Sequence, residues 1–202
     1  MKLGARQLML VRMLPLCMAS LLLWPSIRHA VDARMSLVML LEFPILLTCG
    51  WTLGNMLPAQ LSSRLGRLNA MGLSAMTALL MVFSYWMIPA ALDEALLTPA
   101  AYSARHFSWL AAGALLALPR PECTPGVQVF FLGNLAWMAA SAGMLYRESE
   151  TRLCVNYLLQ DQLLAGDGLI AAALLMFGAV IWIAYRGLLH PAAASPRTTQ
   201  TQ

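Results

Sequence analysis

The stretch that decides the fold is residues 35–57, MSLVMLLEFPILLTCGWTLGNML. A helix needs roughly 20 residues to cross a membrane, and this apolar run is long enough. Its only charged side chain is Glu42, two residues before Pro44. An ionisable residue in such a segment is costly and marks a functional site by default. Met35 and Met39 lie seven and three residues before Glu42, so a helix places all three on one face, and thioethers suit Cu(I).

The composition of the whole chain agrees with a membrane protein. Of its 202 residues, 60% are hydrophobic and 11% are charged, and the mean hydropathy is +0.68. A soluble domain of this size carries about a quarter charged residues. The apolar runs are continuous, and a membrane span must satisfy its own backbone hydrogen bonds, so we expect an all-α, polytopic transmembrane helical bundle. The net charge of +4 reflects arginines that flank the helices and does not indicate nucleic-acid binding.

Six hydrophobic segments predict about six spans: 8–27, 35–57, 70–92, 106–119, 126–146 and 160–185. The first follows basic residues as in a signal peptide, but no small-x-small cleavage site follows it, so it is interpreted as an uncleaved span. The fourth is short for a span. Residues 1–190 are expected to form a single transmembrane domain, and residues 191–202 a disordered polar tail.

Lysine and arginine are more frequent in cytoplasmic loops, and their positions predict the orientation. With the N-terminus inside, eight of them fall inside and five outside, whereas nearly all loop carboxylates fall outside. Both termini are therefore predicted to be cytoplasmic, in a multi-pass protein of a bacterial inner (plasma) membrane.

This orientation gathers unusual polar residues at the outer side of the membrane. They are His29 and Asp32 before the second span, Asp93 after the third, His106 at the fourth and Asp161 at the sixth. Each has a structural alternative: His106 as an interfacial residue, the aspartates as helix caps, the methionines as packing, and Glu42 as a protonated carboxyl bonded to a neighbouring helix. Their convergence on one side is the sequence evidence for a site.

The sequence contains no pattern typical of an enzyme. There is no glycine-rich phosphate loop, no HExxH or GxSxG motif, and no recognisable pair of nucleophile and base. The four cysteines form neither a CxxC pair nor a zinc-binding spacing. We therefore expect a protein that binds and transfers rather than one that catalyses a reaction.

Three short motifs resemble the CtaG-type cytochrome c oxidase assembly proteins. They are YWMIPAALDEAL at 85–96, RHFSWLAAG at 105–113 and LQDQLLAG at 159–166. In that family a Trp-His-x-Pro motif and an aspartate lead to a Glu-His pair that opens the next helix, and Asp-Gln-Gln-x-x-Gly begins the last shared helix. Residues 35–50 occupy the place of a helix with a His-Met-x-x-His pattern, and the resemblance covers about residues 28–186.

The chain departs from the family at residues that matter for metal binding. Met87 stands where the family has histidine, Asp32 and Met35 stand near its histidines at the start of the second span, and Arg105 replaces the glutamate before His106. Methionine in place of histidine keeps a Cu(I) site while losing affinity for Cu(II). The same replacements also fit a relative that binds no metal, and the sequence leaves both interpretations open.

The resemblance implies an oxidase assembly factor that binds or hands over copper at the periplasmic face. The expected partners are cytochrome oxidase subunits, a copper chaperone and membrane lipid. The Cu(I) ligands expected on this basis are His106, Met87, Met35 and Met39. The charge-compensating groups are Asp93, Asp161, Glu42 and Asp32, and the first contact for the metal is His29.

Two alternative functions stay open. The first is a small proton- or ion-coupled transporter in which Glu42 and Asp167 carry the charge. The second is a metal-free scaffold subunit of a respiratory membrane complex, with the GxxxG spacing of Gly50 and Gly54 in a helix interface. The transporter is disfavoured because the inner halves of the predicted spans carry almost no ionisable groups.

Overall fold

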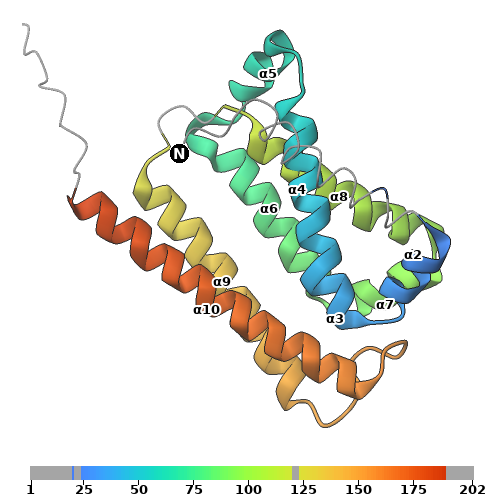
Figure 1. Ribbon diagram of the computed structural model, residues 1–202. Helices are drawn as coiled ribbons and strands as arrows, with labels where there is room; N and C mark the ends of the chain where they lie inside the picture. Colours follow the sequence, from blue (N-terminus) through green and yellow to red (C-terminus); the bar gives the residue numbers. More distant parts are fainter. Residues whose placement is uncertain (1–19, 21–23, 120–122, 190–202) are drawn as a thin grey trace, which may run out of the picture.

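The computed structural model describes residues 20, 24–119 and 123–189, and in this part of the chain it contains helices and no strand (Figure 1). The helices are α2 (Pro25–Asp32), α3 (Met35–Leu37), the π-helix η1 (Val38–Glu42), α4 (Phe43–Asn55), α5 (Ala59–Gly66), the short 3₁₀ helix η2 (Ala70–Gly72), α6 (Leu73–Trp86), α7 (Pro89–Leu97), α8 (Pro99–Ala117), α9 (Pro125–Glu148) and α10 (Leu159–Leu189). The predicted all-α class is confirmed.

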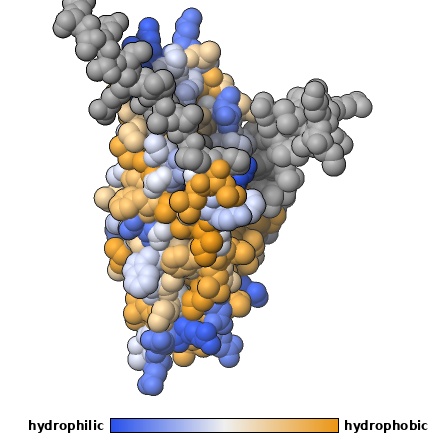
Figure 2. Space-filling model, turned by 90° about the vertical axis from the view of Figure 1, so that its left-hand side faces the viewer, coloured by the Kyte–Doolittle hydropathy of each residue, from blue (hydrophilic) through white to orange (hydrophobic). Residues whose placement is uncertain are grey.

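Three continuous helical segments are long and apolar enough to cross a membrane: Met35–Asn55, Pro125–Glu148 and Leu159–Leu189. A fourth crossing is formed if Ala59–Gly66 and Ala70–Trp86, which are bent by 75°, act together. Figure 2 shows the corresponding surface, an apolar band with hydrophilic residues at both ends. The chain therefore has the helices of a membrane protein.

The expected first span and the tail at 191–202 lie largely or wholly outside the described residues. The number of six spans and the cytoplasmic location of both termini stay predictions.

Two predicted segments have different boundaries in the structure. The run at 70–92 is interrupted after Trp86, and Pro89 begins a separate helix, α7. Pro89 favours a new helix start because proline lacks the amide hydrogen that a helix interior needs. The run at 106–119 is part of α8, which begins at Pro99 after Thr98 accepts a hydrogen bond from the Ala101 amide. α8 is not among the helices apolar enough to span a membrane alone.

The second predicted span changes its helical pitch where it carries Glu42. Residues Val38–Glu42 form a π-helix between α3 and α4, and Pro44 lies in the first turn of α4. Proline cannot donate to the carbonyl four residues earlier, so the regular ladder is interrupted there. Single π-turns inside α-helices are frequent at functional sites.

Glycines bring the long helices together in two close pairs. A Cβ atom added to Gly50 of α4 would lie 2.1 Å from the Leu110 carbonyl oxygen of α8, and one added to Gly113 of α8 equally close to the Leu47 oxygen. Gly143 of α9 and Gly166 of α10 approach each other in the same way. Gly54 also faces α8, so the GxxxG spacing of α4 is used in close helix packing within the chain. The bundle therefore contains a close α4–α8 pair and a close α9–α10 pair, and α6 packs against α8 and α9.

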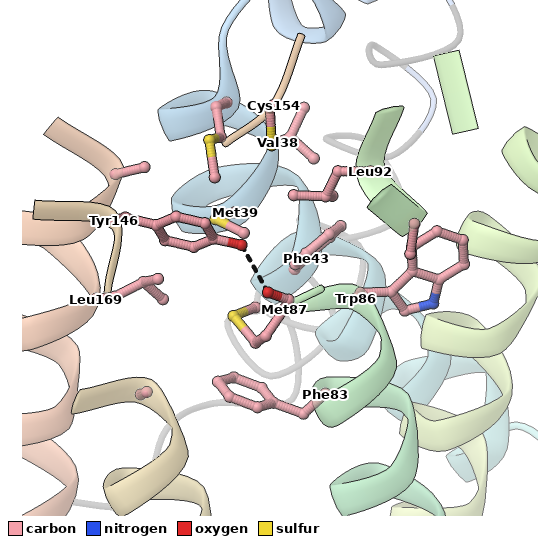
Figure 3. Packing of buried hydrophobic residues seen from close by; sticks show 14 of the residues in the cluster. Val38, Met39, Phe43, Phe83, Trp86, Met87, Leu92, Tyr146, Cys154 and Leu169 are labelled. Atoms are coloured by element: carbon pink, nitrogen blue, oxygen red, sulfur yellow. Dashed lines mark hydrogen bonds between the residues drawn. The ribbon is translucent and has the colours of Figure 1, made fainter. Parts of the chain in front are cut away.

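The end of the bundle that carries α2, α3, α7 and the start of α10, here called the polar end, joins these two pairs. A core of fully buried side chains gathers there, with Val38, Leu92 and Tyr146 each at 0% exposure (Figure 3). The Tyr146 hydroxyl of α9 donates to the Met87 carbonyl at the end of α6, over 2.6 Å. The polar end also contains the candidate site.

Candidate functional site

A buried arginine connects two carboxylates at the polar end. Arg105 of α8 is completely buried, and its Nη2 lies 2.6 Å from Asp32 Oδ1 and 3.2 Å from Glu42 Oε1. Asp32 ends α2 and Glu42 ends η1, so one guanidinium joins three helical segments. A buried charge needs a partner because desolvation is expensive, and an arginine between two carboxylates meets that requirement for all three groups.

His106, the next residue of α8, extends this ion cluster. Its Nε2 lies 2.9 Å from the same Glu42 oxygen, and its Nδ1 lies 2.9 Å from the Tyr102 carbonyl oxygen one turn earlier. The Tyr102 ring lies under two guanidinium groups, 4.2 Å from Arg28 and 4.9 Å from Arg105. Arg28 also reaches Asp32 at 3.6 Å. Arginine on an aromatic face gains cation–π attraction, so Tyr102 helps to fix both cations.

Some atoms of the cluster have no protein partner. Glu42 Oε2 and Arg105 Nε and Nη1 are buried without a hydrogen bond in the described part of the chain. A cavity of about 10 Å³ touches Asp32, Glu42, Tyr102 and His106. That space holds about one water molecule with several polar partners, which is the usual setting of a structural water. The cluster can therefore form hydrogen bonds with one water molecule or a polar group of similar size.

The predicted methionine ligands lie in the hydrophobic core. Met35, Met39 and Met87 are 0–7% exposed and belong to one packed cluster, which also contains the free thiol of Cys154. Figure 3 shows Met39, Met87 and Cys154 entering this core from η1, from the end of α6 and from the loop before α10. The structure thus groups the sulfur atoms in the core and places His106 in the ion cluster. No group of three or more His, Cys, Asp or Glu side chains in the described residues is arranged to hold a metal ion.

The other predicted supporting residues make contacts between segments. Asp161 of α10 accepts hydrogen bonds from the amide and the hydroxyl of Ser36 in α3. Asp93 of α7 accepts from the Val155 and Asn156 amides of the loop before α10, at 2.8 and 3.2 Å. His29 is exposed on α2. Asp161 thus binds an amide at the start of α3, as a helix cap does, whereas Asp93 lies within α7 and binds loop amides instead of capping a helix.

Sequence reasoning missed Arg105 and Tyr157. In the sequence Arg105 is treated as a departure from the family pattern, although Glu42 in an apolar span signals that a buried cation is needed. Tyr157 lies in the loop before α10, is 1% exposed, and its hydroxyl has no partner in the described residues. Burial raises the pKa of Tyr157, so its phenol stays protonated.

Comparisons with protein-family models, with curated proteins and with solved structures find no match. The resemblance to the CtaG-type proteins therefore stays a prediction from the residues quoted above.

Proposed function

We propose that this chain is a cytochrome c oxidase assembly factor of the CtaG type in a bacterial inner membrane, and that it works at the polar end of its bundle. The observation that carries the proposal is that two of the motif segments, 105–113 and 159–166, both contact the segment at 32–42. Arg105-His106 binds Asp32 and Glu42, and Asp161 binds Ser36. Segments separated by 63 to 125 residues in the chain thus form one assembly. Contact between these distant segments supports the interpretation that the short motifs belong to one functional site.

If copper is the cargo of this protein, the methionine sulfur atoms are better candidate ligands than His106. Met35, Met39 and Met87 are soft donors that select Cu(I), and they share one buried cluster. His106 would join them only by leaving Glu42 and Tyr102, because both of its ring nitrogens are engaged. In this proposal Cu(I) is held by thioethers, and the ion cluster keeps the surrounding segments in place.

The first experiment separates assembly from copper handling. In a strain that lacks this chain, wild-type protein should restore oxidase activity and its haem absorbance, whereas the double variant Met35→Leu with Met39→Leu should not. Met176→Leu in α10, outside the proposed ligand set, is the matched control. Full restoration by the double variant would contradict a role for these thioethers.

The second experiment measures copper directly. Purified protein should compete with a chromophoric Cu(I) chelator under anaerobic conditions, and the double variant should compete at least tenfold less well. If wild-type protein restores the oxidase yet never competes for Cu(I), copper handling fails while the assembly role stands.

The metal-free scaffold is the second candidate, and Arg105 favours it. The guanidinium already supplies a positive charge beside the buried Glu42 and the partly buried Asp32, in the place where a bound cation would otherwise do so. Copurification of the chain with an oxidase subunit, without Cu(I) binding, is the outcome expected for a scaffold.

A further inference from the structure

The two helix pairs separate from each other away from the polar end. α10 packs against α3 and η1 there, but α4 does not pack closely along α10, and the two helices diverge in Figure 1. Two cavities lie between the pairs, of about 280 Å³ nearer the polar end and about 340 Å³ nearer the opposite end. Leu79 of α6 and Leu135 of α9 line both cavities, so the two adjoin, and they are here called the cleft.

The cleft has the dimensions of a lipid chain. On α10 its wall runs from Leu169 to Ile183, which is about 21 Å at the helical rise of 1.5 Å per residue. One leaflet contributes about 15 Å of hydrocarbon to a bilayer. Next to the polar end the lining is apolar and includes the rings of Phe43, Phe83 and Trp109. Such a surface inside a membrane favours hydrocarbon over water.

The opposite end of the cleft becomes polar and lies in a basic region. Gln128 and Cys123 line it. Arg186 of α10 follows Ile183 by one turn outside the lining, with its guanidinium 5.8 Å from the centre of the exposed Trp182 ring. Gly187 approaches Pro125 at the start of α9, so this end of α10 lies level with Gln128. This end of the bundle is here called the basic end, because its described charged residues are all arginines: Arg64, Arg67 and Arg186. The described carboxylates of the chain lie in the other half of the bundle. An apolar cleft that opens at a basic end is complementary to an anionic amphiphile.

We propose that this cleft binds one acyl chain of an anionic glycerophospholipid, with the phosphate beside Gln128 and Arg186 and the chain extending to Trp109. The phosphate gains the arginine charge, and the chain fills the space between α4 and α10, which do not pack closely along each other. The lipid comes from the leaflet at the basic end. By the positive-inside rule that is the cytoplasmic leaflet. This proposal is independent of copper and of the oxidase.

Native mass spectrometry of the full chain tests the proposal. Protein transferred from phosphatidylglycerol vesicles into mild detergent should retain one phospholipid, at least fivefold more often than from phosphatidylcholine vesicles. Ala172→Phe, which fills the cleft, should lower the retained fraction at least fivefold. Ala171→Phe, on the exposed side of the same helix, should leave it unchanged. Equal retention by the two variants, or none by wild-type protein, would overturn the proposal, as would a lipid-free dimer.

The headgroup contact has its own test. Arg186→Gln should abolish the preference for phosphatidylglycerol, whereas Arg147→Gln, at the other end of the bundle, should keep it. An unchanged preference in Arg186→Gln would overturn the headgroup assignment.

A fluorescence measurement keeps the proposal testable if Ala172→Phe does not fold. Trp109 is 3% exposed, so a brominated acyl chain quenches it only from within the cleft. Brominated phosphatidylglycerol should lower the tryptophan fluorescence of the wild-type protein, and the decrease should be smaller in Trp109→Phe. Trp137→Phe, which removes an exposed ring on α9, should still show the decrease that comes from Trp109. Identical quenching in wild type and Trp109→Phe would contradict a chain in the cleft.

Discussion

The polar end and the basic end of this bundle are held together by different interactions. At the polar end, side chains from α2, η1, α8 and α10 form ion pairs and hydrogen bonds across long sequence distances. Toward the basic end, glycines let the α4 and α8 backbones touch, α6 packs against α8 and α9, and a cleft lies between the α4–α8 and α9–α10 pairs. Buried charges require fixed partners, so the polar end sets the arrangement of segments. The apolar contacts at the other end are less directional and leave room for a lipid.

Removing the central cation should have the largest effect. Arg105→Met leaves Asp32 and Glu42 without their buried partner, and we expect a loss of about 3–5 kcal/mol in the free energy of unfolding. Adding Glu42→Gln should recover part of this loss, since one uncompensated charge disappears. Thermal unfolding in detergent, followed by tryptophan fluorescence, measures both variants. An equal loss in the single and double variants would show that charge compensation is not the cause.

Separating the α4–α8 pair should have the next largest effect. The Cβ of Gly113→Ala would lie against the Leu47 carbonyl, so the helices must move apart at a cost of about 1–3 kcal/mol. Gly178→Ala in α10 is the control, because nothing lies within 4 Å of its Cβ position. There the higher helix propensity of alanine should stabilise the protein by up to about 1 kcal/mol. The same destabilisation at both positions would contradict close packing as the reason.

Removal of the hydrogen bond between α9 and the end of α6 should have a smaller effect. Tyr146→Phe leaves the Met87 carbonyl without its donor and should cost about 1 kcal/mol. Tyr85→Phe, an exposed ring of α6, should change stability little. Denaturant or thermal unfolding of both variants provides the measurement, and equal stability of Tyr146→Phe and wild type would show that this bond does not hold α9 to α6.

The smallest effect is expected on stability and the clearest on thiol reactivity, which should differ between Cys154 at the polar end and Cys123 at the cleft. Burial, with a smaller contribution from Asp93, raises the pKa of Cys154 to about 12. At pH 8 its thiolate fraction is on the order of one in ten thousand, because a raised pKa keeps the proton on sulfur. In variants that retain a single cysteine, maleimide should label Cys123 at the cleft and leave Cys154 unmodified until the protein unfolds. Rapid labelling of Cys154 in the folded protein would contradict a closed polar end.

Much of the helical architecture follows from local sequence patterns. Continuous apolar runs predict α9 and α10 within a few residues, because hydropathy and helix length coincide there. The same reasoning fails at α7 and α8, where Pro89 and the Thr98 cap, rather than hydropathy, determine where a helix begins. The cost of an ionisable group in a span makes Glu42 a candidate functional residue, and the structure places it in the ion cluster. Its partner Arg105 was not found, since pairing across 63 residues depends on how α4 and α8 cross.

Residue chemistry and spacing therefore suffice to determine that this chain forms apolar helices, carries its described carboxylates in one half and tolerates an ionisable group within a span. These are properties of single segments, because each helix satisfies its own backbone and shows its own hydropathy. The helix pairs, the cation that neutralises Glu42, the separation of His106 from the methionines and the cleft between the pairs are decided by tertiary structure alone. They depend on which faces of distant segments meet, and glycine contacts and buried charges select those faces.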